Sequence, residues 1–202
     1  MRTLVIETAT EACSVALFDG TALVAGTHEL IARGHVERLV PMIAELPDKG
    51  RAGRIAVSLG PGSFTGVRIG LAAARALGLA WDARVLGYPT LALVAAMARR
   101  ENVSPVTVCM AGGHGEWFVQ DFADDGVAQG EPRSLSPETA ASAAPNERVA
   151  GSQAEALVHL RGWGQAVSLL PDARGWSLLP DAFLSERLAP IYGRAPDARL
   201  PA

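Results

Sequence analysis

The residues from Ile55 to Ala80 constrain the fold of this chain more than any other stretch. They begin with the apolar run I-A-V-S-L, continue as the glycine-rich G-P-G-S-F-T-G of residues 60–66, and end in small apolar residues. The alternating apolar side chains of the first run fit a buried strand. Because Pro61 disfavours helical backbone at the residue before it, the strand must stop there. The stretch therefore predicts a strand, a tight turn and a helix over residues 67–80.

The glycine-rich turn is compatible with two interpretations. Gly62 and Gly66 permit backbone angles closed to other residues, and Ser63 or Thr65 can cap the following helix. Together with Gly60 they form a loop whose N–H groups point to the helix start, where the helix dipole favours an anion. A tight strand-to-helix turn without any ligand explains the same residues. No Gly-Lys-Ser/Thr follows, so the turn is not a Walker loop.

The helix after the turn carries an unusually bare face. Gly70, Ala74 and Gly78 recur at four-residue spacing and therefore lie on one side of the helix. Since glycine costs about 1 kcal/mol relative to alanine inside a helix, the two glycines need a structural reason. Close packing on this chain's own sheet is one explanation, and close approach of a partner's helix is the other.

Composition and charge narrow the functional classes. Hydrophobic residues make up 49% of the 202 residues and charged residues 19%, which argues against a disordered chain. The net charge of −3 offers no excess of Lys and Arg for gripping a phosphate backbone, so an RNA role would need a partner's positive surface. We find neither an export signal nor a stretch long enough to span a bilayer, and we expect a cytoplasmic protein without membrane contact.

The first half of the chain predicts a mixed sheet. Asp19-Gly20 is a strong hairpin signal between two apolar runs. After a meander of three strands, strands and helices alternate, which is the order of a mixed sheet flanked by helices. The expected strands are 3–6, 13–18, 22–29, 55–59 and 84–86, and the expected helices begin near residues 35, 67 and 90.

The first of these helices is predicted from an apolar stripe. Its members recur at offsets of three, four and seven. They are Val36, Leu39, Val40 and Ile43. Pro41 lies among them and costs about 3 kcal/mol inside a helix, so we expect a bend or two separate pieces there.

The second half shows a weaker pattern. We expect strands at 106–110 and 117–122, and helices at 137–143, 153–160 and 180–188. The boundary between the halves falls near 101–104. The sequence therefore predicts one lobe over residues 1–101, a smaller lobe over 102–193 and a loose tail over 194–202.

No catalytic or metal site is assembled by the spacing of the candidate residues. The four histidines are scattered without ligand spacing, and no serine or cysteine has an evident base. Glu7 and Thr8 follow the first strand, where a carboxylate can face the magnesium ion of a nucleotide. A simple turn into the next strand explains the same two residues.

Residues 60–70, G-P-G-S-F-T-G-V-R-I-G, closely resemble the signature of the TsaB (YeaZ) family, whose members help to make threonylcarbamoyladenosine in transfer RNA. Supporting similarity lies in I-E-T-A-T-E-A-C-S-V-A-L at 6–17, H-V-E-R-L-V-P at 35–41 and P-I-Y-G-R at 190–194. The first half is similar throughout, and the second half only at scattered points.

The resemblance implies a fold like that of actin, the sugar kinases and the heat-shock chaperone ATPases, with two related lobes of which the second is reduced. It implies a non-catalytic scaffold that pairs with a TsaD-type enzyme in a heterodimer, is joined by a TsaE-type ATPase, and meets tRNA indirectly. No cofactor is expected on this chain alone, and ATP or ADP is expected at the partner interface. The alternative is a stand-alone nucleotide-dependent enzyme or a glycoprotease-like peptidase.

In the family, the first two helices make the partner contact as half of a four-helix bundle. By resemblance this assigns the interface, or a homodimer when the partner is absent, to His35, Val36, Leu39, Val40, Ile43, Gly70, Ala74 and Gly78. The metal-binding histidines of the TsaD-type enzyme have no counterpart in Y-P-T-L-A-L-V at 88–94. Glu7 stands where the family usually has Asp, and A-G-G-H-G-E-W at 111–117 lacks the family's acid and arginine.

Overall fold

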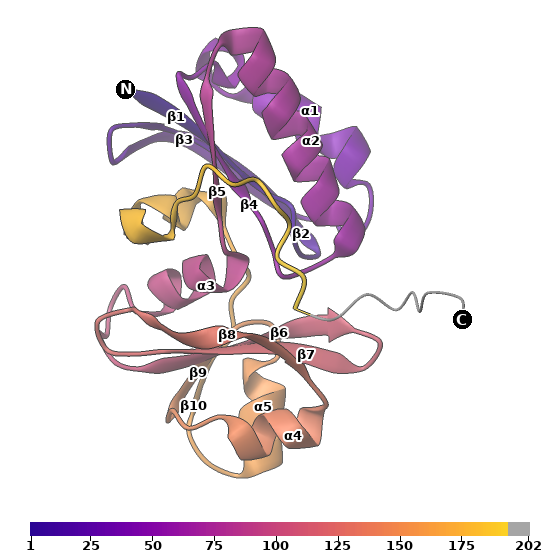
Figure 1. Cartoon of the computed structure of the whole chain (residues 1–202), viewed down its shortest axis with the longest axis vertical. Coiled ribbons are helices and arrows are strands. Elements are labelled where there is room, and N and C mark those ends of the chain that lie inside the picture. The colour runs from indigo at the N-terminus through magenta and orange to yellow at the C-terminus, as the bar shows by residue number, and fades with distance from the viewer. Residues whose placement is uncertain (194–202) are drawn as a thin grey trace.

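Two five-stranded sheets, each flanked by helices, make up residues 1–193, the part of the chain that this computed structural model describes (Figure 1). The lobe built on the first sheet and the lobe built on the second are stacked along the long axis of the molecule, with helix α3 (Thr90–Ala98) between them. The tail predicted at 194–202 lies outside the described residues.

The first sheet has the strand order β3-β2-β1-β4-β5. Its strands are β1 (Arg2–Glu7), β2 (Ala12–Asp19), β3 (Ala22–Leu30), β4 (Arg54–Ser58) and β5 (Arg84–Tyr88). β1 pairs antiparallel with β2 and parallel with β4, so the sheet is mixed, as the sequence predicts. The hairpin predicted at Asp19-Gly20 is confirmed, because β2 and β3 pair antiparallel on either side of it.

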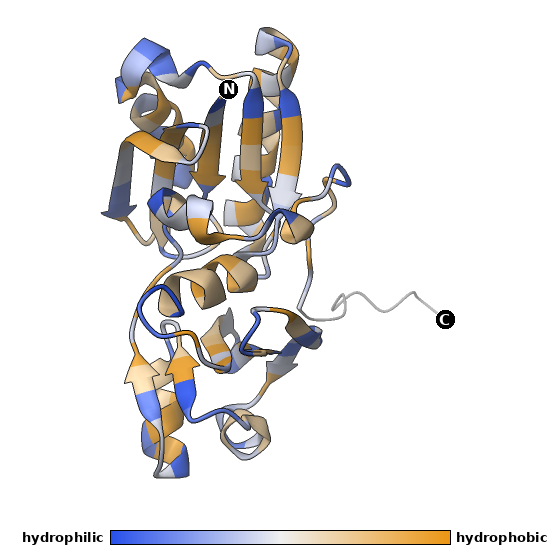
Figure 2. Cartoon of the chain, turned by 90° about the vertical axis from the view of Figure 1, so that its left-hand side faces the viewer, coloured by the Kyte–Doolittle hydropathy of each residue, from blue (hydrophilic) through white to orange (hydrophobic). Residues whose placement is uncertain are grey.

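Both faces of the first sheet are covered. Leu4 and Ile6 of β1 pack under α1 (His35–Glu45) and α2 (Phe64–Trp81), whereas Val5 joins the core on the other face, around α3. This division follows from the two-residue period of a strand. Because both faces are buried, the central strands read as continuous apolar runs, and Figure 2 shows their middle parts as hydrophobic.

The first helix continues through Pro41 as one element, so the alternative of two separate pieces is wrong. Pro41 is exposed, so the carbonyl that loses its hydrogen bond to the missing N–H lies on the side of the helix that faces water. The predicted stripe is split between two environments. Leu39 and Ile43 are buried against the sheet, and Val36 and Val40 are exposed.

The bare face of α2 packs on this chain's own sheet. A Cβ atom added to Gly70 would lie 2.5 Å from Thr8 Oγ1, and one added to Gly78 would lie 2.5 Å from Cγ2 of Val85. Ala74, between them, is fully buried. The small residues therefore let the helix approach β1, β4 and β5 closely. The assignment of Gly70, Ala74 and Gly78 to a partner interface is wrong, because no partner can reach them.

We predict that Ala74→Leu destabilises the fold, because the added atoms have no room between helix and sheet. Overpacking of this kind costs about 1–3 kcal/mol or more. Ala76→Leu, on the exposed side of the same helix, is the matched control and should change the unfolding free energy by less than about 0.5 kcal/mol. Urea unfolding of both variants tests this. Equal midpoints would contradict the packing described above.

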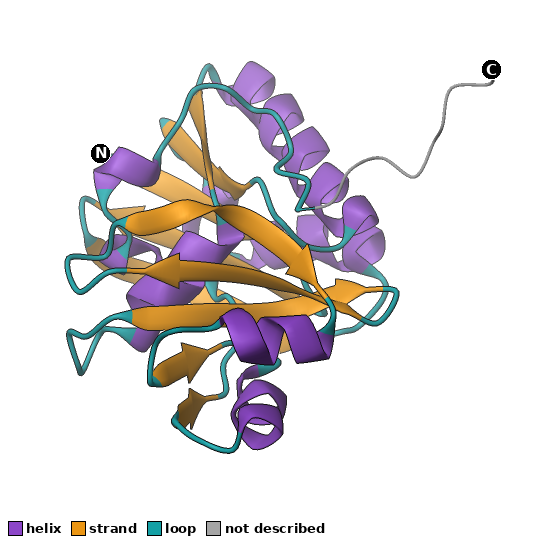
Figure 3. Ribbon diagram, turned by 60° about the horizontal axis from the view of Figure 1, so that its bottom comes forward, coloured by secondary structure: helices purple, strands orange, loops and turns teal. Residues whose placement is uncertain are grey.

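The second sheet repeats the strand order of the first, as β10-β9-β6-β7-β8. Its strands are β6 (Val106–Gly113), β7 (Glu116–Phe122), β8 (Ala128–Leu135), β9 (Arg148–Ala150) and β10 (Gln165–Val167). In each sheet three antiparallel strands are followed by two parallel ones. Helices α4 (Pro137–Ala143) and α5 (Ala154–Arg161) cover the outer face, at the front of Figure 3, and α3 covers the inner face.

Three strands of the second sheet escape the sequence prediction. β8 is an edge strand without a fully buried residue and with a proline, which an edge strand tolerates. It therefore lacks the alternation of apolar side chains that identifies a half-buried strand. β9 and β10 have three residues each, too few to show a period.

The last segment crosses back to the first sheet. It contains two short 3₁₀ turns, η2 (Ala173–Leu178) and η3 (Asp181–Phe183). The N–H of Ala173 donates to Ser14 Oγ at 2.9 Å, and Ser185 exchanges two backbone hydrogen bonds with Gly87 of β5. The helix predicted at 180–188 is therefore wrong, because pairing with the free edge of β5 replaces it. The contacts of this segment also place it on the first lobe, whereas the sequence assigned 102–193 to the second.

Candidate functional site

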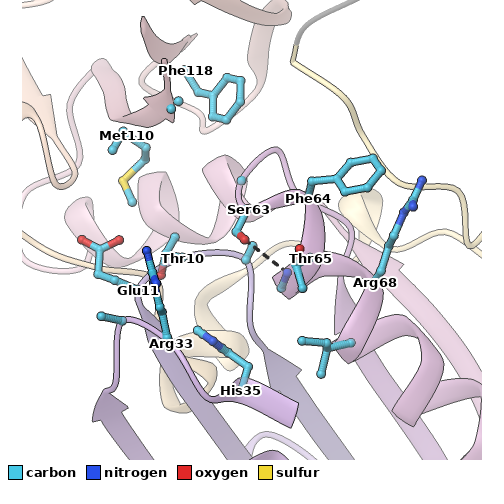
Figure 4. A pocket seen from close by; sticks show the side chains of 18 of the residues that line it. Thr10, Glu11, Arg33, His35, Ser63, Phe64, Thr65, Arg68, Met110 and Phe118 are labelled. Carbon is cyan, nitrogen blue, oxygen red and sulfur yellow. Dashed lines mark hydrogen bonds between the residues drawn. The ribbon is translucent and has the colours of Figure 1, made fainter. Parts of the chain in front are cut away.

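A cleft of about 1120 Å³ opens between the lobes (Figure 4). From the first lobe it is lined by the turn after β1, the loop before α1 and the start of α2. From the second lobe it is lined by the β6–β7 hairpin and Phe118, and residues 191–193 complete it. In Figure 4, Phe118 lies across the cleft from Ser63 and Phe64, and Met110 lies across it from Thr10 and Glu11. The wall from the second lobe is therefore largely apolar, and the wall from the first carries most of the polar groups.

The glycine-rich turn is held against the turn that follows β1. The N–H of Ser63 donates to the carbonyl of Ala9 at 2.7 Å. A Cβ atom on Gly62 would overlap that same carbonyl oxygen, and one on Gly66 would overlap the carbonyl oxygen of Thr8. Ser63 Oγ in turn accepts from the N–H of Gly66 at 3.2 Å and caps α2, as predicted. Two of the glycines are therefore required for backbone-to-backbone contact within this chain.

The predicted anion loop only partly reaches the cleft. Gly62, Ser63, Thr65 and Gly66 line it, with Ser63 and Thr65 exposed. Gly60 is buried, and a Cβ atom there would lie 3.1 Å from the carbonyl oxygen of Ile191. Anion binding at this loop stays a prediction, since the packing just described accounts for two of its glycines without a ligand.

Glu7 and Thr8 do not face the cleft, which contradicts their predicted contact with a nucleotide. Both side chains are buried, and neither lines the cavity. The N–H of Ala9 donates to Glu7 Oε1 at 2.7 Å, and the hydroxyl of Tyr88 lies 3.4 Å from Oε2. Thr8 donates its hydroxyl to the carbonyl of Gly66 at 2.8 Å. Glu7 and Thr8 therefore hold the turn after β1, and Thr8 links it to the glycine-rich turn. This agrees with the simple turn and not with the nucleotide contact.

Burial controls the ionisation of Glu7. Loss of water raises the pKa of this carboxyl from 4.5 to about 7, and hydrogen bonds from the Ala9 N–H, Ser58 and Tyr88 oppose the shift. Burial and the neighbouring Glu7 raise the pKa of Tyr88 well above its usual value of 10. At neutral pH the first sheet therefore holds a carboxyl that is close to its midpoint of ionisation.

We predict a pH dependence of stability that Glu7→Gln removes. Because the pKa of Glu7 is higher in the folded state than in the unfolded state, the folded state binds more protons between about pH 4.5 and pH 7. Its contribution to stability therefore falls as pH rises through this window, by on the order of 3 kcal/mol. Glutamine keeps an acceptor for the Ala9 N–H and does not ionise. The unfolding free energy of the variant should therefore increase relative to that of the wild type as pH rises.

Chemical denaturation at several pH values measures this difference. Glu37→Gln, at an exposed position of α1, is the matched control and should follow the wild type. A constant difference between Glu7→Gln and the wild type across the window would show that Glu7 does not titrate there.

An aromatic and cationic cluster lies at the mouth of the cleft. The rings of Phe64 and Tyr192 have centroids 6.0 Å apart, and Cζ of Arg68 lies 3.5 Å from the centroid of Phe64. Arg68 also donates to the hydroxyl of Tyr192 at 3.2 Å. No role for Phe64, Arg68 or Tyr192 was predicted from the sequence. Their signal was present, because Phe64 and Arg68 belong to the 60–70 signature and Tyr192 to the similar stretch at 190–194.

The outer faces of α1 and α2 carry five exposed apolar side chains, beside exposed charged ones such as Glu37 and Arg75. We call the surface that the five apolar side chains form the helix-pair face. It consists of Val36, Val40, Ala72, Ala76 and Leu79. Leu79 is 89% exposed. His35, assigned to the interface by resemblance, is buried, with Nε2 3.2 Å from the carbonyl oxygen of Ala12. With Leu39 and Ile43 also buried, only Val36 and Val40 of the predicted interface are open to a partner.

Within residues 1–193, no three His, Cys, Asp or Glu side chains are grouped so that they could hold a metal ion. None of the helices in the same range is both long and apolar enough to cross a bilayer.

Two lobes with the same strand order around a cleft define an actin-like ATPase fold. The ethanolamine utilization protein EutJ from Carboxydothermus hydrogenoformans shares the fold, with a TM-score of 0.52 and 11% identity over 89% of this chain and 90% of EutJ. The family model described as TsaD, tRNA N6-adenosine threonylcarbamoyltransferase, matches residues 27–143.

Relatives with higher sequence identity show to which protein family the chain belongs. The tRNA threonylcarbamoyladenosine biosynthesis protein TsaB of Escherichia coli (strain K12) is 40% identical over 140 residues, which are 65% of this chain and 60% of that relative. A crystal structure of a Pseudomonas aeruginosa protein with similarity to peptidase YEAZ superposes with a TM-score of 0.80 and 30% identity, over 96% of this chain and 99% of that one. The chain belongs to the TsaB (YeaZ) family.

Proposed function

We propose that this chain takes part in the biosynthesis of threonylcarbamoyladenosine in tRNA, as the non-catalytic partner of a TsaD-type enzyme. The description of the Escherichia coli relative and that of the matching family model support the pathway. Since the chain spans 60% of that relative, activity and partners are part of the proposal.

The helix-pair face is the observation that carries the partner role. Its five exposed side chains are apolar and lie on two neighbouring helices, and exposed apolar side chains that gather on one face mark interaction sites in soluble proteins. Ala72 and Ala76 are small enough to let another helix approach closely, while Val36 and Leu79 supply side chains to bury. This surface fits a helical partner. It replaces the bare inner face of α2 as the proposed interface.

The stretch at 88–94 supports a role without catalysis. Tyr88 is buried and donates its hydroxyl to the carbonyl of Ile6 at 3.0 Å, and the hydroxyl of Thr90 lies 2.7 Å from that of Ser58. The side chains of residues 91–94 belong to the core around α3. The residues where a TsaD-type enzyme would carry its metal ligands are thus committed to packing here.

Further members of the assembly belong to the same proposal. The cleft begins at the start of α2, whose outer side continues into the helix-pair face. A nucleotide such as ATP or ADP held there would lie beside the partner. A TsaE-type ATPase would join the pair, tRNA would be held largely by the partner, and the complex would be cytoplasmic. Without the partner, the same face would support a homodimer.

The experiment is size-exclusion chromatography with light scattering of this chain mixed with the TsaD-type protein from the same cell. We expect a one-to-one complex that Ala76→Trp abolishes, because an indole on the helix-pair face prevents helices from packing closely. Ala156→Trp, at an exposed position of α5, is the matched control and should leave the complex intact. Circular dichroism verifies that both variants are folded.

Absence of a wild-type complex at concentrations well above micromolar would overturn the partner role. A complex that Ala76→Trp leaves intact would retain the partner role and reject the helix-pair face as its site.

A further inference from the structure

The cluster of Phe64, Arg68 and Tyr192 has no evident role in holding the fold together. Phe64 is 57% exposed and Tyr192 52%, although both carry large apolar rings. Leaving such a ring in water forgoes the stabilisation that burial of its apolar surface would give. Arg68 covers one face of Phe64 and donates to an exposed hydroxyl, so the one hydrogen bond of its side chain within residues 1–193 lies at the surface.

A second arginine–aromatic stack in the chain shows what a structural role looks like. Arg161 lies 3.7 Å from the ring centroid of Trp163, and that ring is 49% exposed. Arg161, however, donates to carbonyl oxygens of residues 144, 146, 147 and 163, and so ties the end of α5 to the preceding loop. These four hydrogen bonds account for the position of the Arg161 guanidinium. Arg68 makes no comparable contact with the backbone of residues 1–193.

The cluster opens onto a cavity whose free polar groups suit a nucleotide unit. Arg33 lines the cleft, is exposed, and its side chain makes no hydrogen bond or ion pair among residues 1–193. The hydroxyl of Thr65 and the ring of His114 line the same space. The carboxylate of Glu11 lines the cleft as well, on the side where Figure 4 shows Arg33. Flat aromatic and guanidinium surfaces stack nucleobases whatever their identity.

The charge of the chain limits how much nucleic acid it can hold. With a net charge of −3 and two arginines at the site, it cannot track a phosphate backbone over many nucleotides. Stacking, which does not depend on net charge, would supply most of the affinity. The arrangement therefore fits one or two unpaired nucleotides and excludes a duplex.

We propose that Phe64, Arg68 and Tyr192 form a stacking platform for an unpaired base of the RNA substrate. This deepens the proposed function and rests on it, because the RNA would be the tRNA that the complex modifies. The platform adds a direct RNA contact to a chain whose tRNA contact was expected to be indirect. The same chemistry would accept a free nucleotide, so the test separates the two sources.

The test is photocrosslinking of a 17-nucleotide RNA hairpin with 4-thiouridine in its seven-nucleotide loop, to the full chain alone and in complex with the TsaD-type partner. We expect mass spectrometry to place the crosslink on Phe64 or Tyr192. We also expect Phe64→Ala and Tyr192→Ala to weaken binding of the labelled hairpin about tenfold each, within the range for the loss of one stacked base. Tyr192→Phe keeps the ring and should bind like the wild type.

Trp163→Ala is the matched control, because it removes an equally exposed aromatic ring that also stacks on an arginine but lies outside the cleft. It should leave binding unchanged. A crosslink elsewhere, or equal affinity for the hairpin in all variants, would overturn the platform, and the partner complex would then still stand. Competition by AMP at the concentration of hairpin that saturates the site would identify a free-nucleotide site and overturn the RNA assignment. Loss of the partner complex in Phe64→Ala would show a protein contact and overturn it as well.

Discussion

The contact between two backbone turns, one after β1 and one after β4, determines where everything near the cleft lies. Gly62 and Gly66 bring their own chain against the carbonyls of Ala9 and Thr8, and the Ser63 N–H donates across the gap. No side chain fits between these segments, so the start of α2 is fixed relative to the first sheet. One wall of the cleft and the direction of the helix-pair face both follow from that contact.

Sequence patterns predict the first lobe because its signals are local. Apolar alternation, the Asp19-Gly20 hairpin and the glycine-rich turn each specify an element without reference to distant residues. The orientation of α2 is not local. Four-residue spacing shows that Gly70 and Gly78 share a bare face, but it cannot show whether a sheet or a partner fills it. In the structure the bare face packs on the sheet, and the opposite face of α2, which carries Leu79, is exposed.

The failures in the second half have the same origin. Residues 180–188 have helical spacing, yet the free edge of β5 offers Ser185 backbone partners that a helix would forgo. β8 carries no apolar period because an edge strand buries little. Glu7 looks like a site residue in sequence because a carboxylate follows a strand. Its environment comes from Ser58 and Tyr88, which meet it only in the folded sheet, so neither its burial nor its raised pKa could be predicted.

Helix α2 connects the cleft with the helix-pair face. Its 18 residues extend about 27 Å, with Phe64 and Arg68 at the cleft end and Leu79 near the other. The buried glycines hold this helix tightly against the sheet, so its two ends cannot move independently. A partner on the helix-pair face and a base on Phe64 would therefore be held at a fixed spacing by one rigid element. Under the proposed function, the role of this chain is to orient the RNA at the interface between the two proteins.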